Sequence, residues 1–246
     1  MSALWALFVA CICDGLDGRI ARLLNASSKL GAELDSLADF VNFGVAPAMF
    51  MYFWMTGGPD HTLADGTVVA RPFIRVVLGC ALYYAMCDCF RLARFNTMLE
   101  DEPIPYWKHF FTGVPAPGGC WMVLTPYILL DSFKVADRWP CAYSFFSSPA
   151  FGMAMLLFVG TLMASRLPTI SLKSVHISKR AQRPVFACAL LLVASLFIDL
   201  WATLGVLGAL YILTVPLTGV AFLRVRAKYE RDAPSVNSSE KTSVGA

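Results

Sequence analysis

Two pairs of aspartates, Asp14 with Asp17 and Asp35 with Asp39, have the spacing of a chemically active group. Residues three or four apart lie on one face of an α-helix, so each pair would present two carboxylates side by side. Hard divalent cations prefer such oxygen ligands, and Mg²⁺ is often shared with substrate phosphates. The spacing therefore predicts a divalent-metal site. Interhelical ion pairs with the basic residues between the two pairs are the structural alternative.

Small residues accompany both pairs of aspartates and would allow close helix packing. Without bulky side chains, two helix backbones or a ligand can approach closely. We therefore expect the two pairs to converge from neighbouring helices. The small residues are Gly15, Gly18, Ala21, Gly31, Ala32 and Ala38.

The elements that must position these aspartates are expected to be membrane helices. Of the 246 residues, 57% are hydrophobic and 15% are charged, and the mean hydropathy is +0.61. A net charge of +3 is too small to suggest nucleic-acid binding. A membrane-spanning helix needs about 20 largely apolar residues. This predicts an all-α, polytopic transmembrane bundle with about seven spans, at 3–22, 32–56, 73–95, 115–131, 147–165, 184–201 and 203–223.

The distribution of basic residues predicts the orientation of the bundle. If the aspartates face the cytoplasm, the outer loops hold only four of the 20 Lys and Arg residues, namely Arg71, Arg75, Lys134 and Arg138. Cytoplasmic loops are enriched in Lys and Arg, so this orientation is favoured. We expect a transmembrane domain over 1–228 and a disordered cytoplasmic tail over 229–246.

The third predicted span ends with two arginines, Arg91 and Arg94. Asp88 is three residues before Arg91 and could pair with it. Arg94 has no acidic residue nearby in the sequence. Arginine suits bidentate contact with carboxylate or phosphate, so we expect Arg91 or Arg94 to bind an anion.

A cation transporter is the alternative from another functional class, but it would place acids near mid-membrane on several helices.

The spacing of the aspartate segment also resembles a known family. Asp14-x2-Asp17-Gly18-x2-Ala21-Arg22-x8-Gly31-x3-Asp35-x3-Asp39 is similar to the signature of the CDP-alcohol phosphatidyltransferases, with all its signature residues in place. The resemblance implies Mg²⁺ or Mn²⁺, as two ions, held by Asp14, Asp17 and Asp35. Asp39 would be the general base and would also contact a metal. The CDP-binding residues would be Asp14, Gly18, Ala21, Arg22 and Gly31.

Further segments resemble the membrane-spanning phosphatidylserine synthase branch of that family, over roughly residues 4–220. They include 35–47, 90–96, 113–117 and 167–173. This resemblance implies CDP-diacylglycerol as donor, L-serine as acceptor and CMP as the other product. With serine as acceptor, the charge and placement of Arg91 and Arg94 lead us to expect that one of them holds the serine carboxylate. A related transferase that uses glycerol 3-phosphate or an inositol phosphate is the nearest alternative.

The family resemblance also carries expectations about location and assembly. It implies a bacterial inner-membrane protein surrounded by membrane lipids, with its active site facing the cytoplasm, and it makes a homodimer an expectation by analogy. It further implies a helix before the aspartate motif that this sequence lacks, so we expect a bundle missing one family helix.

Overall fold

The computed structural model describes residues 2–24, 28–62, 66, 68–98, 110–165, 168–170 and 182–232. Within these ranges the chain is mostly helical, as predicted. The helices are α1 (Ser2–Leu23), α2 (Lys29–Asp39), the π-helix η1 (Phe40–Val45), α3 (Ala46–Thr56), α4 (Arg71–Met98), α5 (Ala116–Ser132), α6 (Val135–Arg138), α7 (Pro140–Phe146), α8 (Pro149–Ala164), α9 (Gln182–Ile198) and α10 (Leu200–Asp232). Two short strands, β1 (Phe110–Thr112) and β2 (Pro168–Ile170), pair antiparallel.

Each of the seven predicted spans coincides with a helix or a run of consecutive helices. Within the described residues, however, only 71–97 form a single helix long and apolar enough to cross a membrane. The pair α7 and α8, bent by 51°, would add a second if it counts as one broken span. The helix positions are thus confirmed, whereas crossing by all seven segments remains a prediction.

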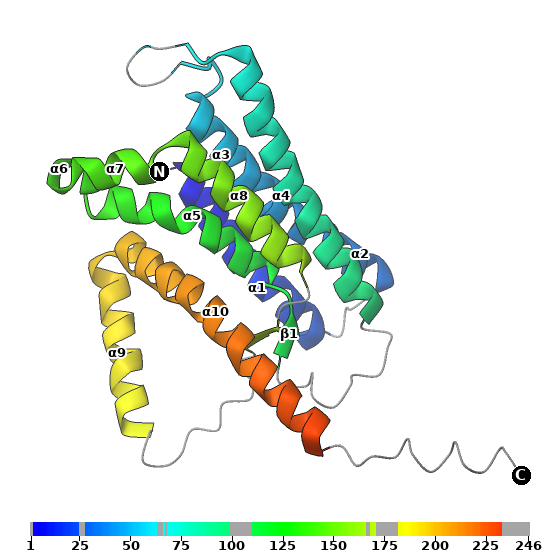
Figure 1. Cartoon of the computed structure of the whole chain (residues 1–246). Coiled ribbons are helices and arrows are strands. Elements are labelled where there is room, and N and C mark those ends of the chain that lie inside the picture. The colour runs from blue at the N-terminus through cyan, green and yellow to red at the C-terminus, as the bar shows by residue number, and fades with distance from the viewer. Residues whose placement is uncertain are drawn as a thin grey trace, which may run out of the picture.

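The helices pack as neighbouring pairs held close by glycines. Figure 1 shows α4 running alongside α8, and α10 passing α5 on the other side of the molecule. A Cβ atom at Gly160 of α8 would lie 3.3 Å from the Cα of Tyr84 in α4. A Cβ at Gly208 of α10 would overlap the side chain of Thr125 in α5. Small residues at these crossings therefore permit close backbone approach.

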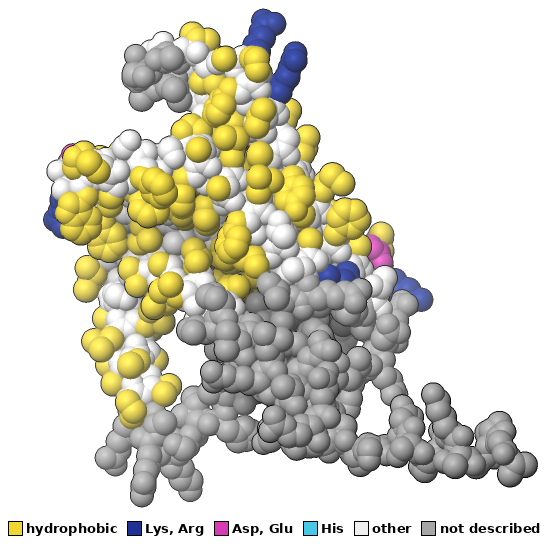
Figure 2. Space-filling model, viewed as in Figure 1, with side chains coloured by type: hydrophobic (Ala, Val, Ile, Leu, Met, Phe, Trp, Pro, Cys, Tyr) yellow, Lys and Arg dark blue, Asp and Glu magenta, His cyan; other side chains and the backbone are white. Residues whose placement is uncertain are grey.

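The surface of the described part is unusually apolar. Phe197, Ile198 and Phe186 on α9 are 88%, 85% and 72% exposed. Figure 2 shows hydrophobic side chains across most of the described part of this face, with charged side chains towards its ends. Soluble monomers rarely expose large contiguous apolar patches. The surface therefore supports a membrane location.

The last helix continues into the segment predicted to be a tail. α10 begins next to Asp199, whose carboxylate accepts a hydrogen bond from the Ala202 backbone N–H at 2.9 Å, and it runs to Asp232. The predicted boundary at residue 229 therefore falls inside α10. The rest of the predicted tail, 233–246, lies outside the described residues.

Candidate active site

Three aspartates meet where α1 and α2 lie against each other. Asp14 and Asp17 lie on α1 and Asp35 on α2, and one carboxylate oxygen of each lies within 4.8 Å of the other two. Asp14 is half-buried, and the other two are exposed. Like charges this close repel one another unless a cation compensates them. Three hard oxygen donors at this separation fit Mg²⁺ or Mn²⁺.

The fourth aspartate of the motif stands beside this group of three. Asp39 is the last residue of α2 and is half-buried. Its carboxyl lies close enough to those of Asp14 and Asp35 to interact with both electrostatically. The predicted convergence of the two pairs from neighbouring helices is therefore found. Metal binding and a base role for Asp39 remain predictions.

A side-chain cap fixes the start of the helix that carries Asp35 and Asp39. The hydroxyl of Ser28 accepts a hydrogen bond from the backbone N–H of Gly31 at 3.0 Å, which satisfies one free donor of the first turn. A Cβ at Gly31 would lie 3.2 Å from that hydroxyl, so a larger residue would crowd the cap. Gly31 thus has a structural role here, besides the CDP-binding role that the family signature implies.

The other predicted CDP-binding residues lie on α1. Gly18 is half-buried and lies one turn beyond Asp14, on the same side of the helix. Ala21 and Arg22 belong to the last turns of α1, but their side chains fall outside the described part of the chain. Their contact with CDP stays a prediction.

A π-helical turn follows Asp39 directly. In an α-helix the Phe43 carbonyl would accept from the backbone N–H of residue 47, but that residue is proline and has none. Within the turn, the Ala46 N–H donates to the Val41 carbonyl, five residues earlier, which is the π-helical pattern. The hydroxyl of Tyr84, on α4, donates to the Phe43 carbonyl at 3.0 Å in the buried interior. The turn therefore ties α4 to the segment that follows Asp39.

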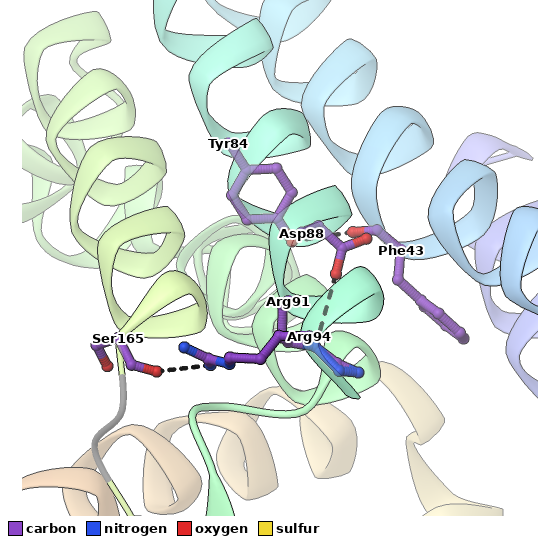
Figure 3. A network of polar contacts seen from close by, with 6 residues as sticks. All are labelled: Phe43, Tyr84, Asp88, Arg91, Arg94 and Ser165. Carbon is purple, nitrogen blue, oxygen red and sulfur yellow. Dashed lines mark hydrogen bonds and ion pairs between the residues drawn. The ribbon is translucent and has the colours of Figure 1, made fainter. Parts of the chain in front are cut away.

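Helix α4 also carries Asp88, Arg91 and Arg94. Figure 3 shows the two arginine side chains extending in different directions. The Nε of Arg91 lies 3.8 Å from Oδ1 of Asp88, so the predicted pair is found. Arg91 also interacts electrostatically with Asp39 on α2. Arg91 therefore links α4 electrostatically to the aspartate motif.

Arg94 extends to the end of α8 instead. Its two terminal nitrogens donate to the carbonyl oxygens of Ala164 and Ser165, at 3.0 and 2.9 Å. These contacts satisfy carbonyls that the end of a helix leaves without intrahelical partners. Arg94 thus has a structural task that the sequence did not indicate. Anion binding by either arginine remains a prediction.

Two features of the site were missed by sequence reasoning. One is the π-turn, for which Pro47 was the available signal. The other is a link between α4 and α2, in which Asn96 Nδ2 donates to Ser36 Oγ at 3.1 Å. Ser36 directly follows Asp35, so this bond helps to set the position of that aspartate. No spacing in the sequence pointed to the second link.

Curated bacterial proteins resemble this chain over much of its length. One from Mycobacterium leprae is 36% identical over 204 residues, which cover 80% of this chain and 60% of that protein. One from Mycobacterium tuberculosis is 38% identical, covering 66% of this chain and 51% of that protein. One from Helicobacter pylori is 30% identical, covering 86% and 76%. All three are named CDP-diacylglycerol–serine O-phosphatidyltransferase.

The chain therefore spans about half to three-fifths of the length of its mycobacterial relatives. The family model for CDP-alcohol phosphatidyltransferases matches residues 1–162, which include all four aspartates and both arginines of the site. With the aspartate geometry described above, these matches show that the chain belongs to the CDP-alcohol phosphatidyltransferase family.

Proposed function

We propose that this chain transfers the phosphatidyl group of CDP-diacylglycerol to L-serine and releases CMP. The observation that carries the proposal is the meeting of Asp14, Asp17 and Asp35 within 4.8 Å, with Asp39 beside them. The name shared by the curated relatives supports serine as the acceptor.

In the proposed reaction Asp39 accepts a proton from the serine hydroxyl. The hydroxyl oxygen then forms a bond to the phosphorus that bears diacylglycerol, and the bond from that phosphorus to the oxygen of CMP breaks. The electron pair of the broken bond leaves with CMP. A general base in this position typically contributes about 10²–10⁴-fold to the rate. The half-buried setting of Asp39 limits competing contact with water.

We also propose that the aspartates bind a divalent metal ion. Asp14, Asp17 and Asp35 would be its ligands, and Asp39 would also contact a metal. Bound there, Mg²⁺ or Mn²⁺ would neutralise charge on the pyrophosphate of the donor. The protein itself contributes the fixed spacing of the carboxylates, which the packing of α1 against α2 provides.

Substrate binding is assigned to the residues around these carboxylates. Gly18, Ala21, Arg22 and Gly31, with Asp14, would line the CDP moiety. Arg91 is the arginine proposed to bind the serine carboxylate, because it interacts electrostatically with Asp39, whereas Arg94 donates to the end of α8. The diacylglycerol chains would stay in the bilayer beside the apolar helices.

The proposed location is the bacterial inner membrane, with the aspartates at the cytoplasmic face. Enzymes of this family are membrane-bound, and the long apolar helix α4 agrees with that location. Soluble serine and released CMP would then exchange with the cytoplasm. A homodimer is part of the proposal by analogy alone.

An acceptor panel with detergent-purified protein tests the function. Labelled CDP-diacylglycerol and Mg²⁺ are supplied with L-serine, glycerol 3-phosphate or inositol phosphate, and the lipid product is identified by mass. We expect phosphatidylserine, formed only with serine and divalent metal. A product formed from one of the other acceptors, with none from serine, would assign the chain to the alternative branch of the family.

A further inference from the structure

One buried carboxylate near the site has no role in the proposed reaction. The Asp88 side chain is completely buried, with an exposed fraction of 0%. Neither of its oxygens has a hydrogen-bond partner within the described part of the chain. Its ionic partner is Nε of Arg91, at 3.8 Å (Figure 3). That distance is too long for a hydrogen bond.

The fold holds this carboxylate in place from the side of the π-turn. A Cβ atom at Gly44, within η1, would lie 2.7 Å from Oδ2 of Asp88, so a glycine leaves just enough room for the carboxylate. One turn earlier on α4, the Tyr84 hydroxyl is fastened to the Phe43 carbonyl. The segment that follows Asp39 therefore determines where Asp88 lies, although Gly44 and Phe43 satisfy neither of its oxygens.

Stability alone does not explain this arrangement. A buried carboxylate without hydrogen bonds is costly, and an ion pair with poor geometry offsets little of that cost. Replacing such a pair by packed apolar residues is often neutral or stabilising. A pair that contributes little to stability points to a role in the chemistry of the neighbouring site.

The effect of Asp88 on Arg91 provides such a role. The Arg91 side chain is only 12% exposed, and Asp88 faces its Nε. No other hydrogen bond or ion pair of Arg91 occurs among the described residues. The guanidinium also interacts electrostatically with Asp39 across the helix interface. With one edge set by Asp88, the planar group can offer its other edge to a carboxylate in bidentate contact.

We propose that Asp88 is a positioning residue that orients Arg91, so that an acceptor bearing a carboxylate is bound beside Asp39. This inference rests on the proposed function and adds a determinant of acceptor specificity to it. Asp88 itself touches no substrate in this account. Its influence on the reaction passes through the Arg91 guanidinium.

A double-mutant cycle measures that influence. Asp88→Asn, Arg91→Gln and the double variant are compared with the wild type by CMP release, varying serine and CDP-diacylglycerol separately. We expect Asp88→Asn to raise the KM for serine about tenfold, the scale of a disturbed supporting contact, and to change the KM for CDP-diacylglycerol less than about twofold. In the Arg91→Gln background, Asp88→Asn should change the KM for serine no further.

Two variants keep the test interpretable. Asp88→Glu retains the charge and should recover part of the serine affinity, even if Asp88→Asn proves too unstable to purify. Asp131→Asn changes an exposed carboxylate at the end of α5 and should leave both KM values unchanged. An unchanged KM for serine in Asp88→Asn, or effects of the two substitutions that simply multiply, would overturn the positioning role.

The assay of the wild-type protein distinguishes a failure of the positioning role of Asp88 from a failure of the proposed function. If wild-type protein uses serine but the cycle shows no coupling, only the role of Asp88 is refuted. If wild-type protein uses an acceptor without a carboxylate instead of serine, the proposed function fails, and the specificity role of Asp88 fails with it.

Discussion

At the scale of single residues, the central feature is a group of carboxylates that repel one another. Asp14, Asp17 and Asp35 come within 4.8 Å because α1 and α2 face each other at these positions. Such a group becomes favourable when a divalent cation lies among its oxygens. Each of the three aspartates should therefore matter for metal affinity, whereas Glu33, an acid of α2 outside the aspartate motif, should not.

Asp17→Asn tests this expectation. Loss of one charged ligand should weaken Mn²⁺ binding at least about tenfold and reduce CMP release in parallel. Mn²⁺ binding can be followed by electron paramagnetic resonance on the detergent-purified protein. Glu33→Gln is the matched control, because Glu33 is exposed on α2 but lies outside the group. Equal Mn²⁺ affinity in Asp17→Asn and the wild type would refute the metal site.

Substitution of Arg94 should mainly lower stability, whereas substitution of Arg91 should mainly raise the KM for serine. Arg94→Gln removes the charged donors from the Ala164 and Ser165 carbonyls and should lower the free energy of unfolding by about 1–3 kcal/mol. Its effect on the KM for serine should be smaller than that of Arg91→Gln. Arg75→Gln, at the exposed start of α4, is the control for loss of charge.

Chemical unfolding in detergent and serine titrations give both quantities. If Arg94→Gln raised the KM for serine as much as Arg91→Gln and left stability unchanged, the serine-binding role would belong to Arg94.

At the scale of elements, the site depends on how α4 is fastened to the chain after Asp39. Within the π-turn η1, the buried Phe43 carbonyl accepts a hydrogen bond from the Tyr84 hydroxyl. Gly44 of the same turn leaves room for the Asp88 carboxylate. π-turns inside helices are frequent at functional sites, where they shift the register of the following residues. This turn lies between Asp39 and the core helix α3, so it couples the proposed base to the packed interior.

Tyr84→Phe should therefore destabilise the bundle by about 1–3 kcal/mol, because a buried carbonyl loses its donor. Tyr83→Phe is the neighbouring control, since the Tyr83 hydroxyl is hydrogen-bonded to Thr161 at an exposed position. Its cost should be clearly smaller. Thermal unfolding of the two variants in the same detergent compares them directly. Equal costs would mean that the Phe43 carbonyl finds another partner.

The positions of most helices could be predicted from the sequence, but several contacts between them could not. Long apolar runs fix where helices lie, and the three- and four-residue spacing placed the aspartates of each pair on one helix face. Pro47 was a local signal near the π-turn, whereas the Tyr84 bond to the Phe43 carbonyl and the Arg94 cap are contacts between distant elements, which no local pattern encodes. The break after α7, by contrast, has local signals, namely Pro149 and the cap at Ser148, whose hydroxyl accepts a hydrogen bond from the Phe151 N–H.

At the scale of the whole molecule, the aspartates and most basic residues are proposed to share the cytoplasmic face. The sequence predicts this asymmetry from its loops, because cations are retained on the cytoplasmic side. Several of those basic residues lie outside the described part of the chain, so their positions rest on the sequence alone. The number of spans likewise remains a prediction beyond the helix at 71–97.

Cysteine labelling tests the orientation. In a background without native cysteines, Asp60→Cys lies in the loop after α3 and Lys29→Cys lies at the start of α2, and both positions are exposed. A membrane-impermeant maleimide added to intact spheroplasts should modify Asp60→Cys and spare Lys29→Cys. Inside-out vesicles should give the opposite pattern. Labelling of Lys29→Cys from outside would reverse the proposed topology.

The most direct test of the account is the dependence of CMP release on Asp39. Detergent-purified wild type, Asp39→Asn and the control Glu33→Gln are assayed with CDP-diacylglycerol, with and without L-serine and Mg²⁺. We predict release by the wild type and Glu33→Gln only when serine and metal are both present, and a loss of about 10²–10⁴-fold in Asp39→Asn. Release by Asp39→Asn at the wild-type rate would contradict the role of this carboxylate as the base of the reaction.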